Sequence, residues 1–185
     1  FVTGATTEHI GGPDVMRGEE TQIIGSAALG LSDGVFVMPG THSKWVHVAL
    51  GKIQDFATYM TGEVFASLKD HTILGTLMEM SDFDLSAFQK GVSAAQDRRA
   101  NLLHDLFHVR TLPLMGKLKE TETADFLSGL LIGTEIVAAL KKNEAKRVTI
   151  VGRNDLADRY EIALQAVGIS CQRAPDDIAA KGHFL

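Results

Sequence analysis

Residues 35–46, VFVMPGTHSKWV, join two apolar strands through a loop that carries more polar side chains than a turn requires. The first strand ends at Met38 and is followed by Pro39 and Gly40. The next four side chains can all form hydrogen bonds or carry charge: Thr41, His42, Ser43 and Lys44. A tight hairpin needs only two turn residues. This segment therefore predicts either a ligand-binding loop or a polar hairpin at a sheet edge.

The segments on both sides of this loop extend the pattern. Residues 44–50 alternate in the two-residue period of a strand, and residues 52–59 form a third β-like run. Upstream, an acidic first turn and apolar residues at helical spacing predict a helix over residues 19–29. The first dozen residues predict the end of a strand followed by a loop. The order around the loop is therefore a helix and then three strands.

The middle of the chain has the periodicity of helices. A helical pattern runs from residue 82 to residue 112, with Ser81 or Asp82 as its N-cap, and a second helix is predicted over residues 123–142. Two glycines spaced four residues apart in the second helix indicate close packing against another element: Gly129 and Gly133.

The last third of the chain alternates between strand-like and helix-like segments. In order, it predicts a strand, a helix, a strand and a further helix in the segments RVTIVG, DLADRYEIALQAVG, ISCQRA and PDDIAAKGHFL. Strands separated by helices pair in parallel. The chain as a whole therefore predicts an α/β fold.

Composition narrows the class of protein. The 185 residues are 45% hydrophobic and 22% charged, with a net charge of -5 and one cysteine, Cys171, so an internal disulfide is excluded. Lys and Arg are scattered, which gives no basic surface for nucleic acid or an anionic membrane. No apolar run approaches the roughly 20 residues that span a bilayer. We expect a cytoplasmic protein with small-molecule partners, and a homodimer is left open.

One pair of histidines has the spacing of metal ligands. In HDLFH, His104 and His108 share a helical face, as in the zinc-protease pattern H-E-x-x-H, with Asp105 in place of Glu. No third ligand is apparent in the sequence. We therefore interpret the pair as coincidental and expect no metal ligands in this chain.

The predicted order β-β-β-α-β-α-β-α resembles the ribonuclease-H-like lobe of the actin, hexokinase and Hsp70 superfamily. Kinases of this superfamily connect the first two strands of their second lobe through a Gly-Thr loop that meets the transferred phosphate, and Gly40 and Thr41 occupy that place here. Glycine lets the backbone approach an anion, a hydroxyl adds a donor, and Lys44 adds positive charge. The resemblance implies a phosphate-binding loop at Gly40 and Thr41, and we expect Ser43 to belong to it as well. His42 is either part of the same site or a loop histidine held by ordinary hydrogen bonds.

A pair of acids lies upstream of this loop. Glu19 and Glu20 follow Gly18 at the start of the first predicted helix, and Gly40 lies 21 residues after Glu19. That distance accommodates a three-turn helix, a turn and a strand, so both ends can face one cleft. Related carbohydrate kinases place a catalytic carboxylate, usually Asp, at such a position. The resemblance implies Glu19 as the first candidate for the general base and Glu20 as the second. Alternatively, both acids only stabilise the helix amino terminus.

Five sequence blocks in order resemble the 2-dehydro-3-deoxygalactonokinase family: PDVMRGEETQ, PGTHSKWV, TYMTGE, DHTILGTLM and FLSGLLIGTE. The resemblance covers essentially all 185 residues. It implies ATP-dependent phosphorylation of the sugar acid 2-dehydro-3-deoxy-D-galactonate at its 6-hydroxyl, with Mg²⁺ accompanying the ATP.

Two further groups of residues receive roles from this interpretation. We expect Arg17 to bind the substrate carboxylate bidentately, with Asp14 of the same block also at the substrate. Gly152, Arg153 and Asn154 follow a strand and precede a helix, where α/β folds bind ligands, and by resemblance they approach adenosine. The alternative for these three residues is an ordinary strand-to-helix turn.

Members of the family begin with a first lobe that carries an Asp-x-Gly-Thr-Thr-Asn-like phosphate loop, and these 185 residues contain no such pattern. We therefore expect residues 1–33 to be the end of the first lobe and a crossover helix. Residues 34–185 are expected to form the second lobe, with a helical insertion at about residues 82–142. The protein ligands of Mg²⁺ would then lie in the first lobe. The rival interpretation is a non-catalytic, truncated lobe that binds a sugar acid or a nucleotide.

Overall fold

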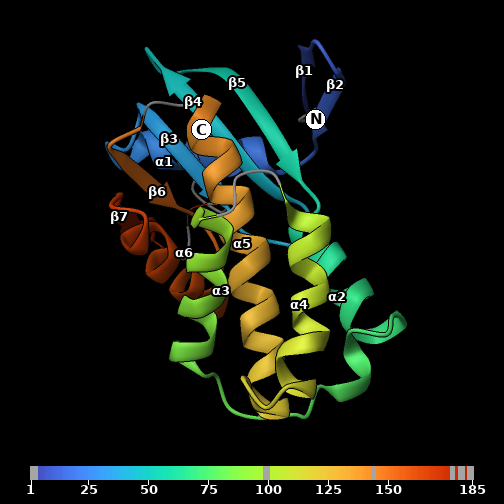
Figure 1. The fold of residues 1–185 in the computed structure, drawn as a ribbon. Helices are drawn as coiled ribbons and strands as arrows, with labels where there is room; N and C mark the ends of the chain where they lie inside the picture. Colours follow the sequence, from blue (N-terminus) through green and yellow to red (C-terminus); the bar gives the residue numbers. More distant parts are fainter. Residues whose placement is uncertain (1–3, 98–100, 143–144, 176–177, 179–181, 183–185) are drawn as a thin grey trace.

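The computed structural model describes residues 4–97, 101–142, 145–175, 178 and 182. Its centre is a five-stranded mixed sheet in the order β5-β4-β3-β6-β7 (Figure 1). The strands are β3 (Gly34–Met38), β4 (Ser43–Ala49), β5 (Lys52–Tyr59), β6 (Arg147–Ile150) and β7 (Ser170–Arg173). The helices are α1 (Glu19–Ala28), α2 (Thr61–His71), α3 (Leu85–Asp97), α4 (Leu102–Leu114), α5 (Thr123–Lys142) and α6 (Asn154–Ala166), with short 3₁₀ turns at Gly75–Leu77 and Glu120–Glu122. The predicted α/β class and the order of its strands are confirmed.

The direction of the strands changes at β3. This strand pairs antiparallel with β4, with Val37 opposite Trp45, and parallel with β6, with Val37 opposite Ile150. β4 and β5 are antiparallel, and β6 and β7 are parallel, as the alternation of strands and helices predicts. The carboxyl ends of β3 and β6 and the start of β4 therefore meet at one edge of the sheet.

The sheet is buried on both faces by different helices. Val35 and Val37 of β3 pack with residues of α3, α5 and α6, whereas Phe36 and Met38 pack with Ile23 of α1. Successive side chains of a strand point to opposite faces. The apolar run VFVM therefore serves two cores, and the sheet lies between α1 on one side and α5 and α6 on the other.

The turn between β4 and β5 shortens the predicted strand by one residue. Leu50 and Gly51 both have positive φ angles, 55° and 68°, and the carboxylate of Asp33 accepts their backbone N–H groups. Two successive positive φ angles form the hairpin turn that matches the twist of the flanking strands. β4 therefore ends at Ala49.

The helical region between α2 and β6 differs from the prediction in two respects. The helical pattern predicted from residue 82 to residue 112 is divided between α3 and α4, and residues 98–100 between them lie outside the described residues. The N-cap is neither Ser81 nor Asp82: the Asp84 carboxylate accepts the backbone N–H of Ala87 at 2.8 Å, so α3 begins at Leu85. In Figure 1, α3, α4 and α5 extend away from the sheet as a bundle.

The first residues form a hairpin and not the predicted strand end and loop. β1 (Ala5–His9) and β2 (Gly12–Met16) pair antiparallel and lie against β5. The Thr7 hydroxyl donates to the Asp55 carboxylate at 3.0 Å. The helix predicted after Pro175 lies outside the described residues except for Ile178 and Gly182, which are helical and lie within contact distance of α1.

The segment Glu120–Lys141 has the length and apolar character of a membrane-spanning helix, with a mean hydropathy of 1.5 in its most apolar window. Of that window, 72% is buried inside the fold. This burial is typical of the central helix of a globular core. The segment corresponds to α5 and the turn before it.

The close packing predicted from the glycines of α5 is present. A Cβ atom on Gly129 would lie 2.0 Å from the carbonyl oxygen of Phe88, and one on Gly91 of α3 would lie 2.1 Å from that of Phe126. A Cβ on Gly133 would lie 2.9 Å from that of Ala95. The backbones of α3 and α5 therefore touch, and glycine is required at the contact.

Replacing Gly129 by Ala should destabilise the protein. The added methyl group forces α3 away from α5, and we expect this overpacking to lower the free energy of unfolding by about 1–3 kcal/mol despite the better helix propensity of Ala. Urea unfolding of the full-length variant measures this loss. Gly11→Ala is the matched control, because Gly11 has no neighbour within 4 Å of an added Cβ. Equal stability of both variants would contradict the backbone contact.

Candidate functional site

A pocket of about 750 Å³ opens at the edge where β3 and β6 end. It gathers eight residues that the sequence marked as candidates: Glu19, Gly40, Thr41, His42, Lys44, Gly152, Arg153 and Asn154. They come from the start of α1, the β3–β4 loop and the turn before α6. The prediction that Glu19 and Gly40 face one cleft is therefore confirmed.

The loop after β3 is supported by the amino terminus of α2. The backbone N–H of Glu63 donates to the carbonyl oxygen of Thr41 at 3.0 Å. A Cβ on Gly62 would lie 2.5 Å from the carbonyl oxygen of Gly40, so only glycine allows this approach. Gly40 itself has no neighbour within 4 Å of an added Cβ.

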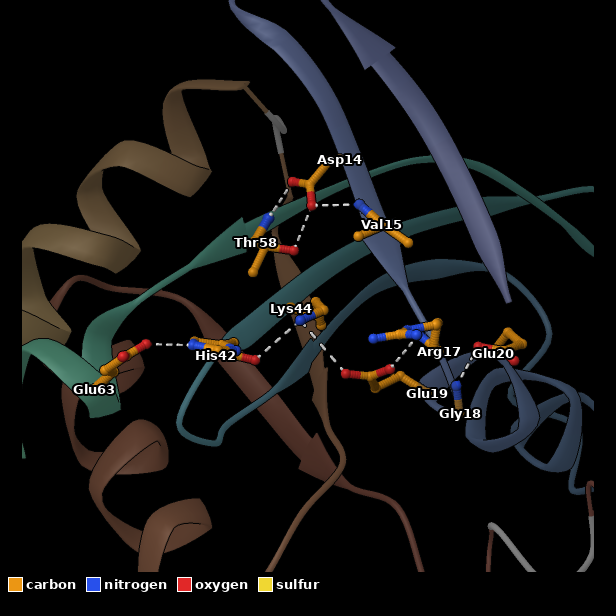
Figure 2. A network of polar contacts seen from close by, with 10 residues as sticks. All are labelled: Asp14, Val15, Arg17, Gly18, Glu19, Glu20, His42, Lys44, Thr58 and Glu63. Atoms are coloured by element: carbon orange, nitrogen blue, oxygen red, sulfur yellow. Dashed lines mark hydrogen bonds and ion pairs between the residues drawn. The ribbon is translucent and has the colours of Figure 1, made fainter. Parts of the chain in front are cut away.

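An ion pair and a histidine–carboxylate hydrogen bond involve two side chains of the pocket wall, Lys44 and His42 (Figure 2). The Lys44 ammonium lies 3.4 Å from Glu19 Oε1 and donates to the carbonyl oxygen of His42 at 3.3 Å. His42 Nε2 lies 2.5 Å from Glu63 Oε2. The Lys44 side chain is only 6% exposed, whereas those of His42 and Glu63 are about half exposed. The pocket therefore contains a fixed, buried ammonium group and a more accessible histidine–carboxylate pair.

The two acids of α1 have different surroundings. Glu19 lines the pocket, and its Oε2 accepts the backbone N–H of Arg17 at 3.0 Å. Glu20 is buried, and its carboxylate accepts the backbone N–H of Gly18 at 2.8 Å. Figure 2 shows the two carboxylates on separate partners. Glu20 is therefore the more enclosed of the two acids, and its hydrogen bond with Gly18 stays within the start of α1.

The residues expected at the substrate do not line this pocket. The Asp14 carboxylate accepts the backbone N–H and the hydroxyl of Thr58, both at 2.7 Å, together with the backbone N–H of Val15. The two bonds from Thr58 fasten β2 to β5. Arg17 is exposed in the turn before Glu19, outside the lining of the pocket.

The turn after β6 contributes a second charged pair. Arg153 precedes α6 and donates to both carboxylate oxygens of Asp155, at 3.2 and 2.8 Å. This exposed pairing raises the pKa of the guanidinium and lowers the pKa of the Asp155 carboxyl, in both cases mainly through the hydrogen bond. Gly152 lies against Pro39, which brings this turn beside the β3–β4 loop.

Ser43 does not face the pocket as predicted. It is fully buried, and its hydroxyl donates to Glu135 Oε1 of α5 at 2.5 Å. Trp45 Nε1 donates to the same oxygen at 2.7 Å, Tyr160 donates to Oε2 at 2.7 Å, and the Thr61 hydroxyl also donates to Oε2. Burial raises the pKa of the Glu135 carboxyl even though the hydrogen bonds favour its ionised form.

Sequence reasoning missed Glu135. The available signal was a carboxylate in the middle of an otherwise apolar helix. Such a group is rarely buried unless it is paired or hydrogen-bonded.

Within the part of the chain that the structure describes, no group of three or more His, Cys, Asp or Glu side chains could hold a metal ion. His104 and His108 lie edge to face on α4, and His108 Nδ1 is 3.6 Å from the Asp105 carboxylate. They lie outside the lining of the 750 Å³ pocket.

Three known proteins are similar to this chain in sequence or in fold. The chain is 38% identical to 2-dehydro-3-deoxygalactonokinase of Escherichia coli (strain K12) over 97% of its length. A crystal structure from Sinorhizobium meliloti, whose name assigns it to the same kinase, matches 97% of the chain and 61% of its own chain with a TM-score of 0.89 and 35% identity. Component A of (R)-2-hydroxyglutaryl-CoA dehydratase from Acidaminococcus fermentans matches 90% of this chain and 64% of its own with a TM-score of 0.55 and 13% identity, which shows a shared fold alone.

The extent of these matches defines what the chain represents. It spans 61% of the length of the E. coli relative. The sequence model of 2-keto-3-deoxy-galactonokinase matches residues 1–184. The chain therefore belongs to the 2-keto-3-deoxy-galactonokinase family.

Proposed function

We propose that the full-length protein transfers the γ-phosphate of ATP to the 6-hydroxyl of 2-dehydro-3-deoxy-D-galactonate. Membership of the kinase family supports this activity. The observation that carries it is the convergence of Glu19, the Gly40–Thr41 loop and the Gly152–Asn154 turn on one pocket of about 750 Å³. A carboxylate can act as the general base, and a backbone loop beside an ammonium group can position and stabilise the transferred phosphoryl group.

The proposal includes the architecture expected from the resemblance. The order β5-β4-β3-β6-β7, with three antiparallel strands followed by two parallel ones, supports a ribonuclease-H-like second lobe over residues 34–185. α3 and α4 then form most of the helical insertion, and residues 1–33 connect to the first lobe. The remaining 39% of a relative's length would supply that lobe.

In the proposed mechanism, Glu19 removes the proton from the 6-hydroxyl as its oxygen bonds to the γ-phosphorus. The bond from phosphorus to the β,γ-bridging oxygen breaks, ADP leaves, and the proton remains on the Glu19 carboxylate. The ion pair at 3.4 Å with Lys44 holds the carboxylate in place. The backbone N–H groups of Gly40 and Thr41 stabilise the negative charge on the transferred group.

The residues of the pocket suit ATP better than they suit its metal ion. The open approach to Gly40 and the Lys44 ammonium suit phosphate oxygens, and Gly152 with Asn154 would line adenosine. Mg²⁺ neutralises phosphate charge when it accompanies ATP. Glu19 is the only acidic side chain in the lining of the pocket as described. The proposal therefore assigns the protein ligands of Mg²⁺ to the first lobe.

A coupled assay that detects ADP formation by the full-length protein tests the activity. Turnover with 2-dehydro-3-deoxygalactonate, ATP and Mg²⁺ is expected. Turnover with an unrelated sugar and not with 2-dehydro-3-deoxygalactonate would contradict the proposed substrate. Binding of ATP without any turnover would favour the non-catalytic rival.

Replacing Glu19 by Gln should lower kcat by about 10²- to 10⁴-fold, because the amide keeps the shape of the side chain but cannot accept the proton. KM for ATP should change little. Steady-state kinetics of the full-length variant give both values, and Glu8→Gln on the exposed face of β1 is the control. If Glu20→Gln loses turnover while Glu19→Gln does not, the base is the neighbouring residue.

Replacing Gly40 by Val should abolish detectable phosphoryl transfer in a folded protein. The added side chain meets no protein atom within 4 Å at its Cβ, so the thermal midpoint should fall by only a few degrees, about 1–2 kcal/mol at most. It would instead occupy the approach of the phosphate. Thermal melts and the coupled assay test both parts, with Gly11→Val as control. Full activity of Gly40→Val would show that the loop is a simple turn without a role in phosphate binding.

A further inference from the structure

Glu135 connects α5 to three other elements through one buried carboxylate. Its side chain belongs to a residue that is 3% exposed, and every donor that reaches it comes from outside α5. Ser43 and Trp45 lie at the start of β4, Thr61 is the first residue of α2, and Tyr160 belongs to α6. The position of the Glu135 carboxylate therefore depends on four hydrogen bonds together and not on one pair.

Two of these connections lead directly to the β3–β4 loop. Ser43 immediately follows His42, so its hydrogen bond to Glu135 fixes the end of the loop. Thr61 immediately precedes Gly62, whose Cα lies so close to the Gly40 carbonyl that a Cβ would be 2.5 Å from it. Movement of either anchor therefore moves the backbone that faces the pocket.

We propose that Glu135 is a positioning residue that holds the Gly40–Thr41 backbone at the distance from the pocket that phosphoryl transfer needs. The inference rests on the proposed kinase function. Glu135 does not line the pocket and touches neither substrate in this proposal. It acts through Ser43 on one side of the loop and through Thr61 on the other.

The use of a carboxylate, and not an apolar side chain, follows from the donors around it. Ser43, Thr61, Trp45 and Tyr160 present three hydroxyl groups and an indole N–H toward one buried point. A carboxylate can accept four such bonds at once, and each unmatched buried donor would otherwise be costly. Hydrogen bonds also fix direction, which apolar packing does not.

Two substitutions at Glu135 test whether its hydrogen bonds to the loop anchors are needed for turnover. In Glu135→Gln, the amide oxygen can accept from Ser43 and Trp45, while the amide N–H₂ can donate to the Thr61 and Tyr160 hydroxyls, which also act as acceptors. We expect kcat within about 5-fold of wild type for this variant, because the anchors keep their places. In Glu135→Ala all the links are lost, and kcat should fall about 30-fold or more, since a 1 Å displacement can cost about 10²-fold.

Binding provides a readout that does not depend on turnover. Calorimetric titration with a non-hydrolysable β,γ-bridged ATP analogue should show about 10-fold weaker binding to Glu135→Ala than to wild type or Glu135→Gln, as expected for lost phosphate contacts. KM of Glu135→Ala for the sugar acid should stay within about 3-fold of wild type, because the proposal places no loop contact to the sugar acid. Wild-type protein that binds the analogue with this pattern but has no sugar-acid turnover would refute the proposed substrate while supporting the positioning role.

Two control variants exclude a general loss of stability. Gly129→Ala destabilises α5 at its contact with α3, and Thr134→Ala removes a hydroxyl that donates only within α5, to the carbonyl of Leu130. Both should keep kcat and analogue affinity near wild type when assayed well below their melting temperatures. An equal loss of kcat in Gly129→Ala would overturn the proposal.

Ser43→Ala keeps the test decisive if Glu135→Ala does not fold. It removes one link to the loop, and kcat should fall about 10-fold. If Glu135→Ala folds, the double variant Ser43→Ala/Glu135→Ala should lose as much kcat as Glu135→Ala alone, because the effects of residues that act as a unit are not additive. Wild-type kcat and analogue affinity in a folded Ser43→Ala or Glu135→Ala protein would show that the cluster is only structural.

Discussion

The pairing of β3 determines where this protein can bind a ligand. This strand runs antiparallel to β4 and parallel to β6, so the chain leaves β3, enters β4 and leaves β6 at the same edge of the sheet. Backbone groups just beyond the ends of strands are not used by the sheet ladder and are available to a ligand. The position of the pocket therefore follows from strand direction, and the side chains at its wall decide its chemistry.

α5 links this edge to the rest of the fold by two different interactions. Toward α3, glycines let the two backbones touch, as at Gly129 and Gly91. Toward the sheet, the same helix presents Glu135 to β4, α2 and α6. The first contact depends on the absence of side chains and the second on a matched set of polar atoms. The first contact fixes α3 against α5, and the second connects α5 to the elements beside the β3–β4 loop.

The sequence predicted the elements and the pocket better than the partners of individual side chains. Periodicity is local, so the strands of the five-stranded sheet, α5 and the separation of Glu19 from Gly40 could be inferred, whereas the β1–β2 hairpin was missed. Ser43 could not be assigned correctly, because its partner lies 92 residues away in sequence. Asp14 is predicted at the substrate, but the sequence does not indicate that its carboxylate accepts hydrogen bonds from Thr58, 44 residues away. A sequence displays donors and acceptors, whereas their pairing depends on the folded chain.

The glycines of the fold separate packing requirements from ligand requirements. Gly129 and Gly62 are needed because backbone carbonyl oxygens occupy the space of a Cβ, and Gly51 because its φ angle is positive. Gly40 meets neither condition: it has no positive φ angle, and an added Cβ would have no neighbour within 4 Å. Neither strain nor packing accounts for glycine at this position. A ligand that must approach the backbone closely would account for it, as the proposed phosphate role requires.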